Sequence, residues 1–190
     1  MRYETDIVSA YADASPKRRV EIILDNFRDI PMIIEGDENT LKILVTSEKR
    51  YNRSREKDGI GVRIQSGGCG DPTASEAIEN LAILEAIRSC RDLDNVMAGT
   101  DYPEEYKRRA YILQDMREDY NLIASQLQTL PANERIFLSD YLQGLTDIPG
   151  IMDSENCAYS TAKNRVWRFR KHIKTKALVC LTHKYSSRGE

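Results

Sequence analysis

The sequence predicts an all-α protein. Helix-forming residues such as Ala, Leu, Glu, Lys and Arg dominate its 190 residues, whereas only 10 are glycine and 6 are proline. Runs of β-branched residues are short, and 41% of the chain is hydrophobic, which is enough for a packed core. The length suits one medium domain or two small ones. We expect an N-terminal helical region over residues 1–130 and a compact C-terminal domain over residues 131–190.

The first expected helix lies in the stretch SPKRRVEIILDNFRDIPMII, residues 15–34. Ser15 can cap it and Pro16 suits its first turn, and Pro31 should end or kink it. The apolar residues that recur at helical spacing are Val20, Ile23, Leu24 and Phe27. Residues 36–58 are compatible with a second helix or with a charged connector, and residues 59–66, GIGVRIQS, alternate weakly enough to be extended.

A glycine-rich loop then leads into the next expected helix. Asp71 can cap this helix, Pro72 fits its first position, and Thr73 with Glu76 can form a capping box. A phosphate-binding loop is the weaker interpretation, because no Lys-Ser/Thr pair follows the glycines. The helix should run to about Asp94. Its expected apolar face consists of Ile78, Leu81, Leu84 and Ile87, with Ile83 and Cys90 alongside.

A second long helix is expected over residues 103–130, after a break at residues 97–103. Its apolar residues follow a heptad pattern in which Arg109 is the one polar interruption. The residues of this seam are Tyr106, Leu113, Tyr120 and Leu127, with Met116, Ile123 and Leu130 three positions after the last three of them. The two long helices should form an antiparallel hairpin over residues 73–130. The seam either packs only within the chain, which is the commoner case, or also forms a homodimer.

The C-terminal domain reads as three helices. The first covers residues 131–144, with Ile136, Leu138, Tyr141 and Leu142 apolar and Gly144 as its stop. The second covers residues 146–153 and is capped by Thr146 or Asp147, with Pro149 in its first turn. The third begins near Tyr159 or Ser160 and buries Ala162, Val166, Phe169 and Ile173. Its opposite face carries Ser160, Lys163, Asn164, Arg168 and Lys171.

This arrangement predicts a helix-turn-helix. A short positioning helix holds the third helix so that its first two turns can enter the major groove of double-stranded DNA. Arg and Lys there can bind phosphates or guanine, and Asn can bind adenine through two hydrogen bonds. Trp167 can stack on a sugar or a base, although at this spacing it more often covers the edge of the core.

The charge distribution supports an anionic partner. From Thr161 to the end the chain has nine Lys or Arg and one acid, a net charge of +8, although the formal net charge of the whole chain is −2. The remainder therefore carries −10. A polyanion is the expected partner of this basic segment, and a solvated terminal helix is the alternative.

The C-terminal segment resembles region four of bacterial sigma factors. The resemblance rests on LP…ER…YLQGLTDI…STAKNRVWRFRKHI, about 45 residues whose order matches that region. Upstream, GVRIQSGGCGDPTASEAIENLAILEAI and the predicted hairpin are similar to the phage-associated regulators of the RinA and ArpU type. The resemblance implies a transcriptional regulator of phage or prophage genes that binds double-stranded DNA and also RNA polymerase.

The same resemblance implies which residues bind DNA. Lys163, Asn164 and Arg168 occupy the base-contact positions, Arg165 matches the family arginine, and Trp167 lies at a further exposed position. Together with neighbouring residues, the expected DNA-binding set is Ser160, Thr161, Lys163, Asn164, Arg165, Trp167, Arg168 and Lys171. The sequence departs from the family pattern at Pro149 and Gly150, where small helix-favouring residues are usual. The approach to the third helix is also about one residue longer, so we expect a short or distorted positioning helix.

Other classes of function have less support. The only histidines, His172 and His183, form no nucleophile–histidine–acid pattern, and Cys180 with His183 is at most half a zinc site, so we expect neither an enzyme nor a cofactor. The alternatives are a DNA-packaging subunit like a small terminase and a module that mainly binds RNA polymerase. No apolar run is long enough to span a membrane, and no signal peptide or disulfide framework is indicated. We therefore expect a cytoplasmic protein with reduced cysteines.

Overall fold

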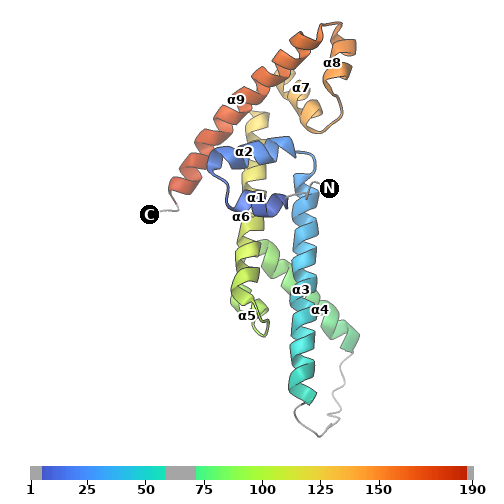
Figure 1. The fold of residues 1–190 in the computed structure, drawn as a ribbon, viewed down its shortest axis with the longest axis vertical. Helices are drawn as coiled ribbons and strands as arrows, with labels where there is room; N and C mark the ends of the chain where they lie inside the picture. The colour runs from blue at the N-terminus through green and yellow to red at the C-terminus, as the bar shows by residue number, and fades with distance from the viewer. Residues whose placement is uncertain (1–5, 59–71, 188–190) are drawn as a thin grey trace. The chain divides into compact units, whose positions relative to one another are not determined.

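The computed structural model of the chain describes residues 6–58 and 72–187. In these ranges it has nine helices and no strand, which confirms the predicted all-α fold class (Figure 1). The helices are α1 (Ile7–Ala12), α2 (Pro16–Asp25), α3 (Ile30–Asp58), α4 (Pro72–Ser89), α5 (Leu93–Met97), α6 (Pro103–Gln128), α7 (Ala132–Leu142), α8 (Ile148–Glu155) and α9 (Tyr159–Ser186).

The chain divides into two compact units. Unit 1 comprises Met1–Met32 and Met116–Glu190, and unit 2 comprises Ile33–Asp115. Helices α3 and α6 each contribute residues to both units. The compact units do not follow the expected boundary at residue 131, because the N-terminal helices α1 and α2 belong to the same unit as α7–α9.

Helix α2 begins where the sequence predicts and ends earlier. The side chain of Ser15 caps it by accepting a hydrogen bond from the backbone N–H of Arg18 at 3.4 Å, and Pro16 takes the first position. The helix ends at Asp25, after which the Asn26 side chain donates to the carbonyl of Ile22 at 2.8 Å. Pro31 lies in the first turn of α3, where a missing N–H breaks no helical hydrogen bond. The prediction that Pro31 ends or kinks the first helix is therefore wrong.

Residues 36–58, which the sequence left open between helix and connector, belong to α3. The segment GIGVRIQS and the expected cap Asp71 lie outside the described residues. The start of α4 at Pro72 agrees with the prediction.

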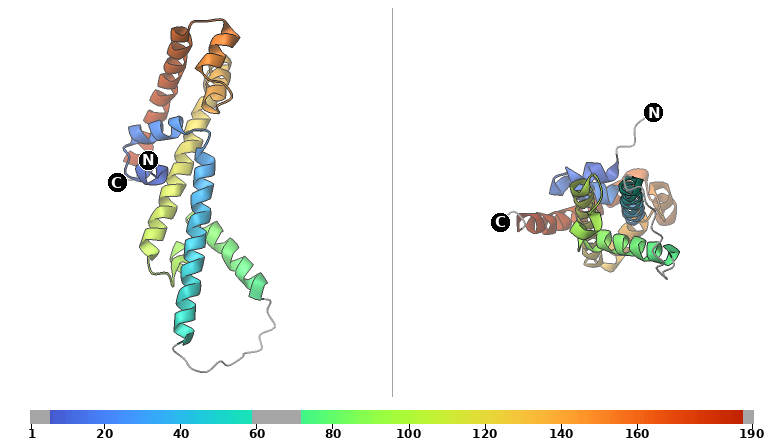
Figure 2. Two further views of the ribbon diagram at one scale, coloured as in Figure 1. Left: turned by 45° about the vertical axis from the view of Figure 1, so that its right-hand side comes forward. Right: turned by 90° about the horizontal axis from the view of Figure 1, so that it is seen from below.

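The core of unit 2 joins all four of its helices. Its buried residues come from α3 (Leu41, Val45), α4 (Ile83, Ala86, Ile87), α5 (Leu93, Met97) and α6 (Ala110). Figures 1 and 2 show α4 crossing α3 at an angle. Polar contacts extend along this crossing, because Arg50 and Arg53 pair with Glu76 and Glu79, and Thr46 donates to Asn80 at 2.9 Å.

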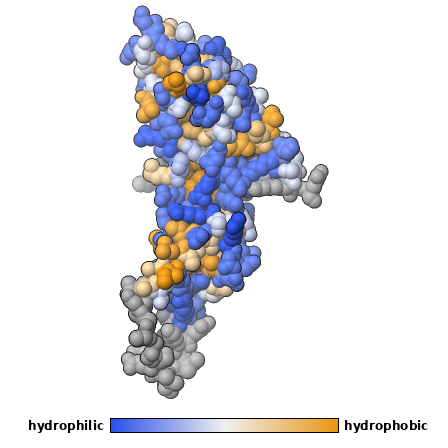
Figure 3. Space-filling model, turned by 180° about the vertical axis from the view of Figure 1, so that it is seen from behind, coloured by the Kyte–Doolittle hydropathy of each residue, from blue (hydrophilic) through white to orange (hydrophobic). Residues whose placement is uncertain are grey.

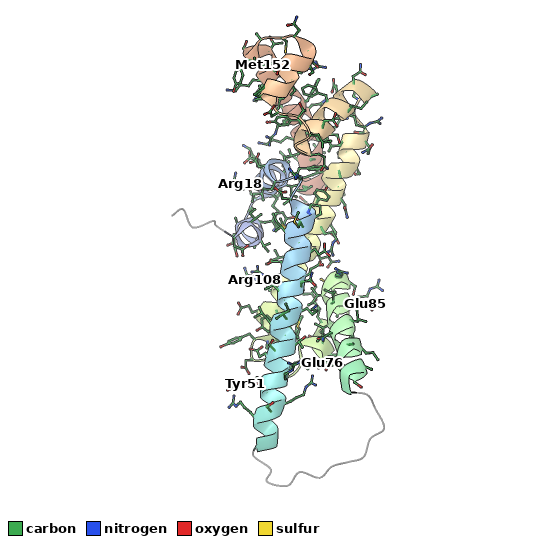
Figure 4. The ribbon with its side chains drawn as sticks, turned by 90° about the vertical axis from the view of Figure 1, so that its right-hand side faces the viewer. Arg18, Tyr51, Glu76, Glu85, Arg108 and Met152 are labelled. Atoms are coloured by element: carbon green, nitrogen blue, oxygen red, sulfur yellow. The ribbon has the colours of Figure 1, made fainter. Side chains whose placement is uncertain are left out.

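The expected extent and buried face of α4 are partly wrong. The helix ends at Ser89 rather than near Asp94, because Cys90 and Asp92 adopt left-handed backbone conformations with φ of 51° and 56°. Ile83 and Ile87 are buried as expected, whereas Ile78 and Leu81 are 68% and 67% exposed. Figure 3 shows hydrophobic side chains gathered on this outer side of α4, and Figure 4 shows Glu76 toward α3 and Glu85 away from it.

Helix α6 has the predicted range to within two residues, and its seam is buried. The completely or nearly buried residues of the seam are Leu113, Met116, Ile123, Leu127 and Leu130. The polar interruption Arg109 binds Asp37 of α3 at 2.6 Å. Burial and a hydrogen bond to Glu48 of α3 raise the pKa of Tyr106 to about 12. These contacts pair the first half of α6 with α3, and the predicted hairpin of α4 with α6 is not confirmed.

Unit 1 contains a buried acidic residue that connects three helices. Asp119 of α6 is completely buried and accepts hydrogen bonds from Tyr11 at 2.5 Å, Tyr185 at 2.8 Å and Lys184 at 2.7 Å. The guanidinium of Arg19 lies 4.6 Å from the ring centres of both tyrosines. Burial and the neighbouring Asp119 raise the pKa of Tyr11 far above its usual range, so its hydroxyl stays protonated and donates.

Among the described residues, no helix combines the length and the apolar character that crossing a bilayer would require.

Candidate nucleic-acid interface

Helices α7 and α8 form the support of the candidate site, and both begin and end close to their predicted bounds. Helix α7 stops at Gly144, whose φ of 68° is a left-handed conformation that glycine adopts without strain. Of the apolar residues of α7, Leu138 and Leu142 are buried, whereas Ile136 is 57% exposed.

The unusual residues Pro149 and Gly150 fit the first turn of α8. The Asp147 side chain caps this helix by accepting a hydrogen bond from the backbone N–H of Gly150 at 2.8 Å. A Cβ atom on Gly150 would lie 3.0 Å from Oγ1 of Thr146 and 3.2 Å from Oδ1 of Asp147. A glycine at this position therefore leaves room for the cap, and α8 is helical over Ile148–Glu155. The expected distortion is absent, although the helix is short.

Helix α9 packs on α7 and α8 through the face that the sequence predicts. Ala162, Val166, Phe169 and Ile173 are all at most 5% exposed. The Phe169 ring meets the Phe137 ring of α7 edge-on, with centres 5.4 Å apart. Residues Ile148, Ile151 and Met152 of α8 pack in the same cluster as Val166. This packing fixes which side of α9 faces outward.

The outward face of α9 presents seven of the eight predicted residues. At 3.6 residues per turn they occupy an arc of about 160° opposite the buried face. The exposed residues, which we call the α9 face, are Ser160, Thr161, Lys163, Asn164, Trp167, Arg168 and Lys171. Trp167 is 61% exposed, so it does not cover the core edge as the sequence favoured. The Lys171 ammonium lies 4.9 Å from the centre of its ring.

Arg165, the eighth predicted residue, is directed toward the supporting helices. Its guanidinium forms an ion pair with Glu155 at the end of α8 and lies 4.6 Å from the Phe137 ring centre. One side chain thus connects α7, α8 and α9. In this position Arg165 fixes the orientation of α9 and is not on the α9 face.

The cations of the basic segment fall into two groups. Arg170 binds Asp25 at 2.5 Å, Lys174 pairs with Glu21, and Lys184 binds Glu118 at 2.9 Å as well as Asp119. By contrast, in the described part of the chain no ion pair involves Lys163, Arg168 or Lys171. The paired cations hold α9 against α2 and α6, and the three cations of the α9 face are available to an anion.

The acids of α2 are functional neighbours that sequence reasoning missed. Hydrogen bonds from Lys174 and Arg18 lower the pKa of Glu21, so its carboxylate stays ionised and keeps Lys174 paired. Glu21 and Asp25 lie one helical turn apart, which places both on one side of α2. This spacing is visible in the sequence and indicates an acidic side of α2. The sequence does not indicate the partners, because Lys174 follows Glu21 by 153 residues and Arg170 follows Asp25 by 145 residues.

Within the described residues, no group of three or more His, Cys, Asp and Glu side chains is placed to hold a metal ion. His172 lies beside Glu134 of α7, with Nδ1 3.5 Å from the carboxylate. Cys90, Cys157 and Cys180 are free thiols. No protein-family model, no curated protein and no solved structure matches the chain.

Proposed function

We propose that the chain is a sequence-specific DNA-binding regulator of transcription and that the α9 face lies in the major groove. The observation that carries the proposal is the sorting of the cations. Lys163, Arg168 and Lys171 are exposed on one face beside Asn164 and form no ion pair among the described residues, whereas Arg165, Arg170 and Lys174 pair with acids of the same chain. A face with free cations and an amide can bind both phosphates and base edges.

The helices around α9 favour this use. Its first turns pack on α7 and α8 and keep their opposite face exposed, and Arg165 holds the three helices together. A rigidly packed helix with an exposed polar face is the element that helix-turn-helix proteins insert into DNA. The resemblance to region four of sigma factors and to RinA- and ArpU-type regulators adds the proposal that the targets are phage or prophage genes.

The test is a titration of the full chain with DNA fragments from the genomic region around its own gene, in the presence of random duplex DNA as competitor. We expect one fragment to be preferred by orders of magnitude, with an affinity that falls as salt rises because several phosphates are bound. Replacement of Lys163 or Arg168 by Ala should weaken specific binding by about 1–3 kcal/mol.

The matched control is Arg91→Ala. Arg91 is an exposed arginine of unit 2 for which the described residues contain no ion-pair partner. This variant should bind like the parent. Equal and weak binding to all fragments would contradict the proposal and favour a packaging subunit or a module that binds RNA polymerase, which a polymerase pull-down and the size of the oligomer would separate.

A further inference from the structure

Unit 1 has a groove beside the α9 face, between α2, α8 and the middle of α9. Its volume is about 720 Å³. Apolar side chains form its inner surface, since Leu24 and Val166 are buried and Ile148 and Leu178 are half-buried. We call it the α2–α9 groove.

The two edges of the α2–α9 groove differ in charge. One edge has Trp167 between Lys163 and Lys171, and neither lysine has an ion-pair partner among the described residues. The other edge has Glu21 and Asp25 of α2, which Lys174 and Arg170 already neutralise. On one side only, next to an apolar surface, the groove therefore offers two positive charges that have no acidic partner among the described residues.

We propose that the α2–α9 groove binds an acidic amphipathic segment of a partner protein. The apolar side chains of the segment would contact Leu24, Ile148 and Trp167, and its Asp or Glu side chains on one flank would pair with Lys163 and Lys171. This is the helix-in-groove mode of recognition, in which apolar side chains supply affinity and flanking charges fix the orientation.

The charges favour a protein segment over nucleic acid inside the groove. A phosphate backbone that entered the groove would approach the carboxylates of Glu21 and Asp25, and it has no apolar side to cover Leu24 and Val166. An amphipathic segment covers this apolar surface and needs acids on one flank only. The segment and the DNA would both use Lys163 and Lys171, so binding of the segment would exclude the proposed binding of DNA. The groove proposal itself does not require DNA binding.

Trp167 provides the readout, because it is the single tryptophan of the chain. The probes are two helical peptides of about 18 residues that share a stripe of leucines along one face. The Glu peptide carries glutamates on one flank of this stripe, and the Lys peptide carries lysines at the same positions. Titrated into the full chain without DNA, the Glu peptide should change the Trp167 fluorescence and bind at least about tenfold more tightly than the Lys peptide. Equal affinity for the two peptides, or binding of neither, would overturn the proposal.

Two variants test whether the peptide lies in the groove. Thr175 is an exposed residue of the groove wall beyond the α9 face, and Thr175→Phe should fill the groove and weaken the Glu peptide about tenfold. Thr182→Phe adds the same ring at another exposed position of α9, outside the groove, and should bind like the parent. Unchanged affinity in Thr175→Phe would overturn the proposal, while the DNA titration above tests the α9 face separately.

Discussion

Arg165 and Arg168 lie three residues apart in α9 and have different roles. Arg165 is an arginine with a partly covered side chain, an ion pair to Glu155 and a ring contact to Phe137. Arg168 is exposed and, in the described residues, forms no ion pair. The Arg168 guanidinium lies 5.0 Å from the ring centre of Phe169. Arg165 therefore joins two helices through an ion pair, whereas the charge of Arg168 has no acidic partner among the described residues.

We predict that Arg165→Ala lowers the free energy of unfolding by about 1 kcal/mol, because it removes a partly exposed ion pair and a cation–π contact. Arg168→Ala removes a contact with the Phe169 ring but no ion pair, so it should lower the free energy of unfolding by less than Arg165→Ala and should weaken the proposed DNA binding. Urea unfolding of both variants beside the parent measures this difference. A double-mutant cycle of Arg165→Ala with Glu155→Ala isolates the contribution of their ion pair to the free energy of unfolding. A coupling energy of zero would show that the ion pair does not contribute to stability.

At this scale the sequence predicts more about burial than about partners. The helical period places Ala162, Val166, Phe169 and Ile173 in the core and five of the proposed DNA-binding residues outside, because both follow from one packed face. It does not predict the exposure of Trp167. The family resemblance places Arg165 in the predicted DNA-binding set. Its ion pair with Glu155 is not predicted, because Glu155 belongs to a different helix. Periodicity does not distinguish the exposed Ile136 from the buried Leu138, because it does not show which part of an apolar face finds a neighbour.

The helices show the same contrast between local and distant determinants. The caps of α2 and α8, the glycine stop of α7 and the range of α6 follow from nearby residues and were predicted. The buried face of α4 was not, because its sequence is apolar on more than one side. Its orientation is set by α3, whose Arg50, Arg53 and Thr46 bind Glu76, Glu79 and Asn80.

Two helical glycines should respond to alanine in opposite directions. A Cβ on Gly36 in α3 would have no neighbour within 4 Å, so Gly36→Ala should stabilise the protein by about 0.5–1 kcal/mol. Gly150→Ala would crowd the Asp147 cap and should destabilise it by about 1 kcal/mol. Thermal unfolding of the two variants and the parent measures both changes in stability. Equal stabilisation by the two substitutions would show that the α8 cap tolerates a side chain at residue 150.

The packing of α2 on α9 should weaken in acid. The pKa of Glu21 is lower in the folded chain than in the unfolded chain, because Lys174 and Arg18 bind the ionised form. Its stabilising contribution is therefore complete above the unfolded pKa of about 4.3 and is lost as the pH falls through the folded pKa. Between neutral pH and about pH 3, the free energy of unfolding should fall by less in Glu21→Gln than in the parent, because the variant has no carboxylate to protonate at this position. Identical pH profiles would exclude this contribution.

The molecule as a whole shows that unit 1 is built from the two ends of the described chain. Helices α1 and α2 pack with α9, and Tyr11 binds Asp119 across 108 residues. The sequence gives no sign of this, because each helix pattern is local and the partner acids are spread over α2 and α6. The predicted boundary at residue 131 followed the change in sequence pattern and not the packing.

We predict that residues 131–190 alone do not unfold cooperatively. This fragment would lose Glu21, Asp25 and Asp119, and the cations Lys174, Arg170 and Lys184 would lose their acids. Far-UV circular dichroism during heating should show a gradual change for the fragment and a sharp transition for the full chain. A sharp transition of the fragment would mean that α7–α9 form an independent domain.

The discontinuity of unit 1 also determines the order in which the protein can fold during translation. Residues 33–115 leave the ribosome before α9 exists, so unit 2 can fold while α1 and α2 still lack their partner. The contacts of Tyr11 with Asp119 and of Glu21 with Lys174 can form only once α6 and α9 have been made. The N-terminal helices therefore remain open to chaperones and proteases until α9 has been made, and the late closure of these long-range contacts should set the folding rate of unit 1.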